Sequence, residues 1–163
     1  MNLPITTGVV EMSSINRDMV SARQDLLLIG PDDMIVPLTA GLSYTREDPY
    51  AVRVSLDVSL DEPVVWAFGR DLLAAALHGP EGIGDVRAWP SAVSAEVEAE
   101  EEDGSWEKIL NIVLGPPSEC ARFEASAAGI EAFLDRTYEL VPAGQESDCL
   151  NLDAELAELL SQA

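Results

Sequence analysis

A chain of 163 residues is long enough for one domain and short for two. It carries 30 acids and nine bases, which give a net charge of −21. Hydrophobic residues make up 47% of it and charged residues 24%, which is ordinary for a globular protein and argues against wholesale disorder. The excess of acids argues against the basic surface that nucleic-acid binding needs, and no apolar run approaches the length of a membrane span.

The two cysteines, Cys120 and Cys149, lie far apart and outside any CxxC spacing. This pattern predicts neither a disulfide framework nor a metal clip. We therefore expect two reduced thiols in a cytoplasmic protein that reaches a membrane only through a partner.

The first predicted elements are strands. Residues 21–29 end in an apolar run and are followed by Gly30-Pro31-Asp32-Asp33, which is a turn composition. Residues 34–44 form a second apolar segment, in which Pro37 lacks an N–H and favours an edge or a bend of a sheet. Residues 46–49 are predicted to turn the chain again.

The clearest pattern lies at residues 50–61, where apolar side chains from Tyr50 to Leu60 alternate with mostly polar ones. This period of two predicts a long antiparallel strand with one solvent-exposed face. Residues 64–68 predict a more fully buried strand, and residues 71–78 a helix of about two turns that ends at Gly79-Pro80. Residues 85–89 predict a strand ended by Pro90.

In the second half, residues 92–114 form two alternating runs around Asp103-Gly104, which predicts a hairpin. A strand at 120–125 and a helix at 127–140 follow, and the tail predicts a short helix capped by Asp153, with a stripe of Leu156, Leu159 and Leu160. The leucine helices at 71–78 and 153–160 are each too short to be stable alone. One of them crossing a subunit boundary would make the protein a homo-oligomer.

No pattern predicts catalysis or a cofactor. His78, the one histidine, falls at a predicted helix end, where a surface histidine that compensates the helix dipole is the plainer interpretation. No serine stands in GxSxG, and paired acids such as Asp32-Asp33 do not follow a calcium-loop pattern. We therefore predict no enzyme, no catalytic residue, no cofactor and no metal. A small acidic enzyme, with His78 beside carboxylates in a pocket, is an alternative.

Charged side chains are the candidates for an interaction site. Seven acids and no base lie between residues 92 and 107, and such like charges either keep strands from pairing edge to edge or dock a basic partner segment. The three tryptophans, Trp66, Trp89 and Trp106, are open to core packing or an interface. The candidate contact residues are Arg53, Arg70, Arg87, Glu96, Glu98, Glu100 and Asp103.

Several short motifs also occur in a fixed order: DPYAV at 48–52, VWAF at 65–68, RDLL at 70–73, GDVR at 84–87 and Trp89-Pro90. In these the chain resembles the SsgA-like proteins, actinobacterial regulators of sporulation and cell division, over about residues 20–163. Residues 1–19 are then predicted as a flexible extension before an SsgA-like domain at 20–163. The extension and the acidic hairpin depart from the family pattern. The signature positions are Asp48, Pro49, Tyr50, Trp66, Arg70, Asp71, Leu72, His78, Trp89 and Pro90.

The resemblance implies an α+β fold similar to the whirly fold, with twisted antiparallel sheets, packed helices and a trimeric assembly. It also implies a non-enzymatic adaptor that positions septum and cell-wall machinery at division septa. The implied partner is the tubulin-like division protein FtsZ, as in the FtsZ-recruiting branch, or a paralogous SsgA-like protein. Whirly proteins bind single-stranded nucleic acid, which is the alternative function; the acidic charge and the few aromatics argue against it.

Overall fold

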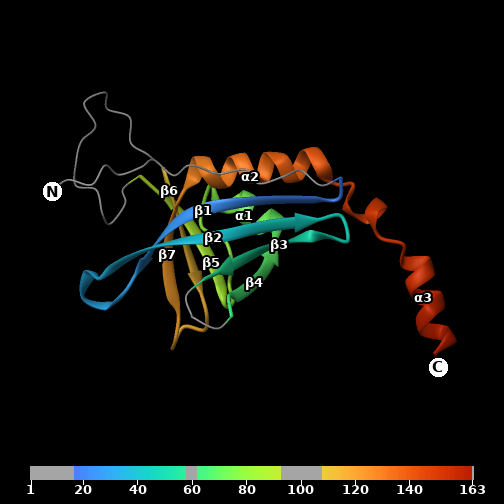
Figure 1. The fold of residues 1–163 in the computed structure, drawn as a ribbon, viewed down its shortest axis with the longest axis horizontal. Coiled ribbons are helices and arrows are strands. Elements are labelled where there is room, and N and C mark those ends of the chain that lie inside the picture. Colours follow the sequence, from blue (N-terminus) through green and yellow to red (C-terminus); the bar gives the residue numbers. More distant parts are fainter. Residues whose placement is uncertain (1–16, 58–61, 93–107, 163) are drawn as a thin grey trace.

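Seven antiparallel strands form one sheet in the computed structural model, which describes residues 17–57, 62–92 and 108–162. The strand order is β4-β3-β2-β1-β7-β6-β5, and the sheet twists and curls (Figure 1). The predicted α+β class with a twisted antiparallel sheet is therefore confirmed. The strands are β1 (Met19–Ile29), β2 (Ile35–Thr45), β3 (Asp48–Leu56), β4 (Val64–Gly69), β5 (Val86–Ser91), β6 (Ile109–Leu114) and β7 (Ala121–Ser126).

Three α-helices accompany the sheet: α1 (Arg70–Ala76), α2 (Ala127–Leu140) and α3 (Leu152–Ser161). The buried core lies between the curled sheet and the first two helices. Side chains of α1 and α2 join it through Leu73, Ile130 and Phe133. No helix in the described ranges is long and apolar enough to cross a bilayer.

The first hairpin confirms the predicted strand, turn and strand. β1 and β2 pair along their whole length, and a 3₁₀ turn at Pro31–Asp33 joins them. Pro37 pairs with Leu27 of β1, whereas the described pairing with β3 begins only at Ala40. The proline therefore lies where β2 has one strand neighbour among the described residues, as its missing N–H requires.

The alternation predicted for β3 is confirmed in part. Val52, Val54 and Leu56 are buried, but Tyr50, predicted on the same face, is 51% exposed. The pairing of β3 with β2 shifts its register between Ser43 and Thr45. This irregularity breaks the alternation before Val52, because extra residues of β3 stand opposite Tyr44. Residues 58–61, predicted to continue the strand, lie outside the described residues.

The prediction that residues 64–68 are more fully buried is wrong. β4 is the outermost strand on one side of the sheet, so it has a single neighbour, β3. Val64 and Val65 are 44% and 56% exposed, and Phe68 is the buried residue of the strand. At the opposite edge, β5 continues through Pro90 to Ser91, so the prediction that Pro90 ends this strand is wrong. An edge strand accommodates the proline, because one side of it needs no ladder hydrogen bond.

Helix α2 has the bounds that the sequence predicts. The Ser126 hydroxyl caps it by accepting a hydrogen bond from the Gly129 N–H, and Ile130, Phe133 and Leu134 point into the core. Helix α1 begins one residue earlier than predicted, at Arg70. Because its Leu73 and Ala76 are buried, its stripe docks within the same chain.

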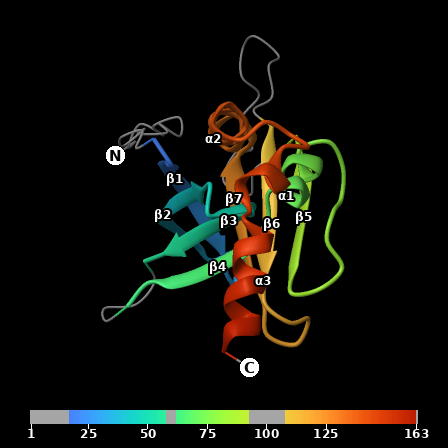
Figure 2. The ribbon, with the colours of Figure 1, turned by 90° about the vertical axis from the view of Figure 1, so that its right-hand side faces the viewer.

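Helix α3 has a different cap from the predicted one and does not pack on the sheet. The Asn151 side chain, not that of Asp153, accepts a hydrogen bond from the Ala154 N–H. Every residue of the helix is exposed, and Figure 1 shows it leading away from the other elements. In Figure 2, which views the molecule from that side, α3 is seen in front of the sheet.

Candidate interaction surfaces

Arg70, predicted as an exposed contact, is buried. Its side chain is 1% exposed. One terminal nitrogen donates to the carbonyl oxygens of Thr137 at 3.2 Å and Val141 at 2.7 Å, and the other forms an ion pair with Glu146. The first turn of a short helix is normally solvated, but here the end of α2 and the 3₁₀ turn at Glu146–Cys149 cover it.

Two tyrosine rings complete the surroundings of Arg70. Its guanidinium carbon lies 4.8 Å from the ring centre of Tyr44 and 4.2 Å from that of Tyr138, distances at which a cation is attracted to a ring face. The Tyr44 hydroxyl donates to the Pro49 carbonyl at 2.8 Å, and the Tyr138 hydroxyl lies 3.5 Å from an Asp71 carboxylate oxygen. We call Tyr44, Arg70, Thr137, Tyr138, Val141 and Glu146 the Arg70 cluster.

Burial and charge shift the ionisable groups of the Arg70 cluster. Burial raises the pKa of Tyr44 to about 12, although the Arg70 charge opposes the shift. Burial also raises the pKa of Tyr138. The pKa of Glu146 is lowered, first by a hydrogen bond from the backbone N–H of Glu146 and then by Arg70, although burial opposes this shift. The cluster thus holds one cation against one anion and two neutral phenols, and it ties together α1, α2, β2 and the 3₁₀ turn.

Two more signature residues lie beside the Arg70 cluster, because Pro49 and Asp71 bond to its tyrosines. Asp48 forms an ion pair with Arg53 at 3.1 Å. Leu72 and Trp66 are partly buried against the core, while Tyr50 and His78 are exposed. Trp89 and Pro90 pair with Asn111 and Leu110 of β6. Most of the signature therefore holds the fold together.

The other predicted contact residues do not converge. The Arg53 side chain is 45% exposed on β3. Arg87 is half-buried on β5, at the other edge of the sheet, and its buried Nε has no hydrogen-bond partner among the described residues. Glu96, Glu98, Glu100 and Asp103 lie outside the described residues, as does Trp106.

Groups that bind metals or act as nucleophiles do not gather in the described ranges. Within them, three or more histidine, cysteine or acidic side chains nowhere come together in a way that could hold a metal ion. His78 is exposed just after α1, and its N–H donates to the Ala75 carbonyl. Cys120 is exposed and Cys149 half-buried, and both are free.

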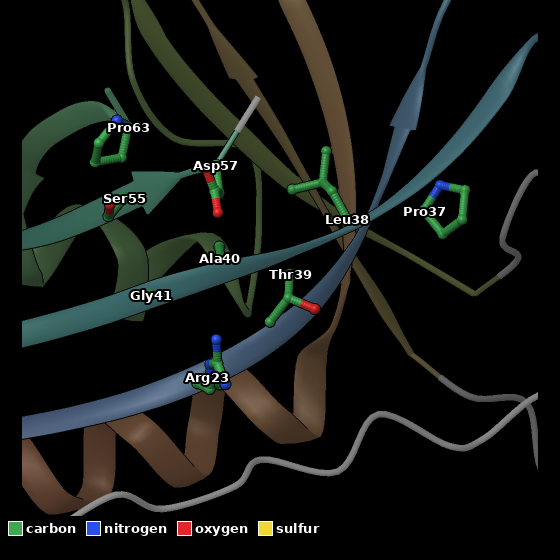
Figure 3. Close-up of a pocket in the computed structure, with 9 residues that line it drawn as sticks. All are labelled: Arg23, Pro37, Leu38, Thr39, Ala40, Gly41, Ser55, Asp57 and Pro63. Atoms are coloured by element: carbon green, nitrogen blue, oxygen red, sulfur yellow. The ribbon is translucent and has the colours of Figure 1, made fainter. Parts of the chain in front are cut away.

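A shallow trough lies on the face of β1–β3 that points away from the core. It consists of two hollows of ≈ 510 and ≈ 350 Å³, which share Arg23, Gly41 and Ser55. Strand register places Gly41 between Arg23 of β1 and Ser55 of β3 (Figure 3). Because glycine has no side chain, the backbone at Gly41 forms the floor of the trough. We call the two hollows together the sheet trough. The sequence did not predict it, because its lining residues come from three strands whose pairing cannot be derived from the sequence pattern.

Comparisons with known proteins agree over most of the chain. A family profile described as "Streptomyces sporulation and cell division protein, SsgA" matches residues 38–146. The "Sporulation-specific cell division protein SsgB" of Thermobifida fusca is 48% identical over 142 residues, which cover 87% of this chain and 95% of that protein. The protein of the same name from Streptomyces coelicolor is 38% identical over 144 residues, covering 88% of this chain and 97% of that one.

Solved structures agree with the sequence comparisons. The crystal structure of an SsgA-like sporulation-specific cell division protein from Thermobifida fusca superposes with a TM-score of 0.72 at 45% identity, over 89% of this chain and 98% of that one. A structure from a study of SsgB mutations and longitudinal division in Streptomyces coelicolor gives 0.70 at 36% identity, over 84% of this chain and 100% of that one. The resemblance carried by the ordered motifs is therefore confirmed, and the chain belongs to the SsgA family of sporulation and cell division proteins.

Proposed function

We propose that this protein is a non-enzymatic regulator of sporulation-specific cell division that works by docking other proteins. The observation that carries this proposal is the 48% identity, over nearly the whole length of both chains, to a protein named for that process. The site of action is the division septum, on its cytoplasmic side. The partner is FtsZ or a paralogous SsgA-like protein, and the regulator itself is a homo-oligomer, a trimer of whirly-like subunits.

Three separate surfaces supply the proposed contacts. Arg53 presents a cation on the outer face of β3, where Asp48 orients it. Arg87, half-buried on the edge strand β5, supplies a second cation at the opposite edge of the sheet. The acids Glu96, Glu98, Glu100 and Asp103 form the third surface, proposed from the sequence to bind a basic segment.

Cosedimentation with polymerised FtsZ tests the proposal. The intact chain is expected to pellet with the polymer, and Arg53→Glu or Arg87→Glu to pellet less. Arg136→Glu is the matched control, because Arg136 lies on α2 and pairs locally with Glu139. A chain that pellets with neither FtsZ nor a paralogous SsgA-like protein contradicts the proposal.

The acidic segment needs its own comparison. A chain in which residues 96–103 are replaced by a serine-glycine linker is expected to lose one of the partners that the intact chain binds. Identical binding of FtsZ and of the paralogue by the two chains would remove this segment from the proposed surfaces and leave Arg53 and Arg87.

A further inference from the structure

Helix α3 exposes more leucine than any other described element. Leu152, Leu156, Leu159 and Leu160 are 54–75% exposed. A helix of ten residues is marginal in water, since helices shorter than about 12 residues gain too few hydrogen bonds to offset nucleation. Helix α3 therefore needs a surface that covers its leucine stripe.

That surface does not come from the helix's own sheet. The segment before α3 is fixed by the buried ion pair of Glu146 with Arg70 and by the 3₁₀ turn at Glu146–Cys149. From this anchor the chain leads α3 away from the strands (Figure 1). An apolar arm that is anchored at its root and leaves its own body is the kind of element that identical chains exchange at low cost.

The arms do not pair well with each other. Leu152, Leu156 and Leu159 follow the four-and-three spacing of a coiled-coil seam. Asp153 and Glu155 then occupy the flanking positions. Two antiparallel helices of identical chains would place acid against acid there, and two parallel helices would place Glu155 against Leu160. The partner of α3 is thus better sought on the body of a second copy.

The sheet trough offers a suitable receiving surface. Pro37 and Pro63 line one of its hollows, and Gly41 leaves the floor open. Arg23 is exposed beside them and forms no ion pair with any described residue. The charged residues of α3 are all acids, namely Asp153, Glu155 and Glu158. They complement Arg23, which lines both hollows, whereas Asp57 lines only one of them.

We propose that α3 of one copy docks in the sheet trough of a second copy, with its leucines over Gly41 and its acids at Arg23. This inference rests on the self-association included in the proposed function. Reciprocal docking also suits the size of the arm. One helix about 15 Å long covers less than the ~800 Å² per partner of a standard interface, whereas a closed ring lets each copy give one arm and receive another.

The oligomeric state of the full chain in solution, measured by light scattering after gel filtration, tests the docking. The wild-type chain is expected to be larger than a monomer. Leu156→Glu with Leu159→Glu is expected to raise the dissociation constant at least about tenfold, because two leucine side chains lose their burial. Ile83→Glu is the control, since Ile83 is fully exposed in the loop before β5.

Two changes test the receiving side. Gly41→Val fills the floor, and its added Cβ would meet the Cβ of Ser55 at 3.7 Å, which is ordinary contact, so the fold persists. Arg23→Glu is expected to weaken the assembly, and adding Glu155→Arg and Glu158→Arg to it is expected to restore it. Circular dichroism confirms that each variant is folded.

Three results would overturn the docking. These are a monomeric wild-type chain, an assembly unchanged by the α3 substitutions, or an α3-dependent assembly that neither Gly41→Val nor Arg23→Glu weakens. Cosedimentation with FtsZ, measured on the same variants, separates the two proposals. Loss of assembly with FtsZ binding retained leaves the proposed docking of division proteins standing.

Discussion

Arg70 connects α1 with β2, α2 and the 3₁₀ turn at Glu146–Cys149. Its planar guanidinium lies between two tyrosine rings and donates to two carbonyls and one carboxylate. A lysine ammonium is a point charge and cannot make this set of planar contacts. Arg70 therefore holds together α1, the end of α2 and the turn that leads to α3.

Removing Arg70 should destabilise the protein strongly. Arg70→Ala leaves Glu146 without its cation and opens a cavity between the tyrosines, so we expect a loss of about 3 kcal/mol or more in the free energy of unfolding. Arg70→Lys keeps the charge and should lose less. Urea denaturation measures both.

Arg53→Ala is the matched control for Arg70. It breaks an ion pair whose two side chains are 45% and 41% exposed, and such pairs contribute less than about 1 kcal/mol. Equal losses for Arg70→Ala and Arg53→Ala would contradict the structural role of the Arg70 cluster.

The raised pKa of Tyr44 predicts a loss of stability in alkali. Its pKa is about 12 in the folded protein and 10.0 in the unfolded chain, so the unfolded state releases the proton first. The stabilisation is complete below pH 10 and is lost as the pH rises toward 12.

Tyr44→Phe should flatten this alkaline decline, because phenylalanine has no proton to release. At neutral pH the variant should lose about 1 kcal/mol through the missing hydrogen bond to Pro49. Urea denaturation between pH 8 and 11 compares the two chains. Some decline should remain, since burial also raises the pKa of Tyr138. A decline equal to that of the wild type would exclude Tyr44 as its source.

At the scale of elements, the sequence predicted a feature correctly where the residues that determine it lie close together in the chain. Helix α2 was predicted at its observed bounds, because an apolar stripe lies within it and Pro142 lies just beyond its end. The burial of β4 was predicted wrongly, because strand order decides which strand lies at an edge. Glu146, the partner of Arg70, was missed because it stands 76 residues further along the chain.

The cap of α2 gives a prediction at this scale. Ser126→Ala removes the side-chain acceptor for the Gly129 N–H and should cost about 1 kcal/mol in the free energy of unfolding. Ser161→Ala is the control, because Ser161 lies at the exposed end of α3 and should change stability by less than about 0.5 kcal/mol. Equal effects of the two changes in urea denaturation would show that the Ser126 cap contributes nothing.

At the scale of the whole molecule, the ordered motifs were enough to predict the family and the sheet class. The sheet trough and the undocked arm could not be predicted, because both depend on how seven strands are ordered and on where the last helix leaves them. Net charge, in contrast, follows directly from the sequence, and it has consequences for binding and for stability.

The charge predicts that single-stranded nucleic acid is not bound. A net charge of −21 repels phosphates, and the protein has nine bases from which to build a binding groove. Fluorescence anisotropy of a labelled oligonucleotide of mixed sequence should not change at physiological salt. Binding that weakens steeply as salt is added would instead support the whirly-like alternative.

The same charge should make folding stability depend on ionic strength. Thirty acids against nine bases repel one another in the compact state, and unfolding moves them apart. Raising salt from about 10 to 150 mM shortens the screening length from about 30 to 8 Å, so the melting temperature should rise by several degrees. Sodium, potassium and choline chlorides should have equal effects, because screening does not depend on which cation is present. A rise confined to one cation would point to specific ion binding, and a flat or falling profile would mean that ion pairs such as Arg70–Glu146 outweigh the repulsion.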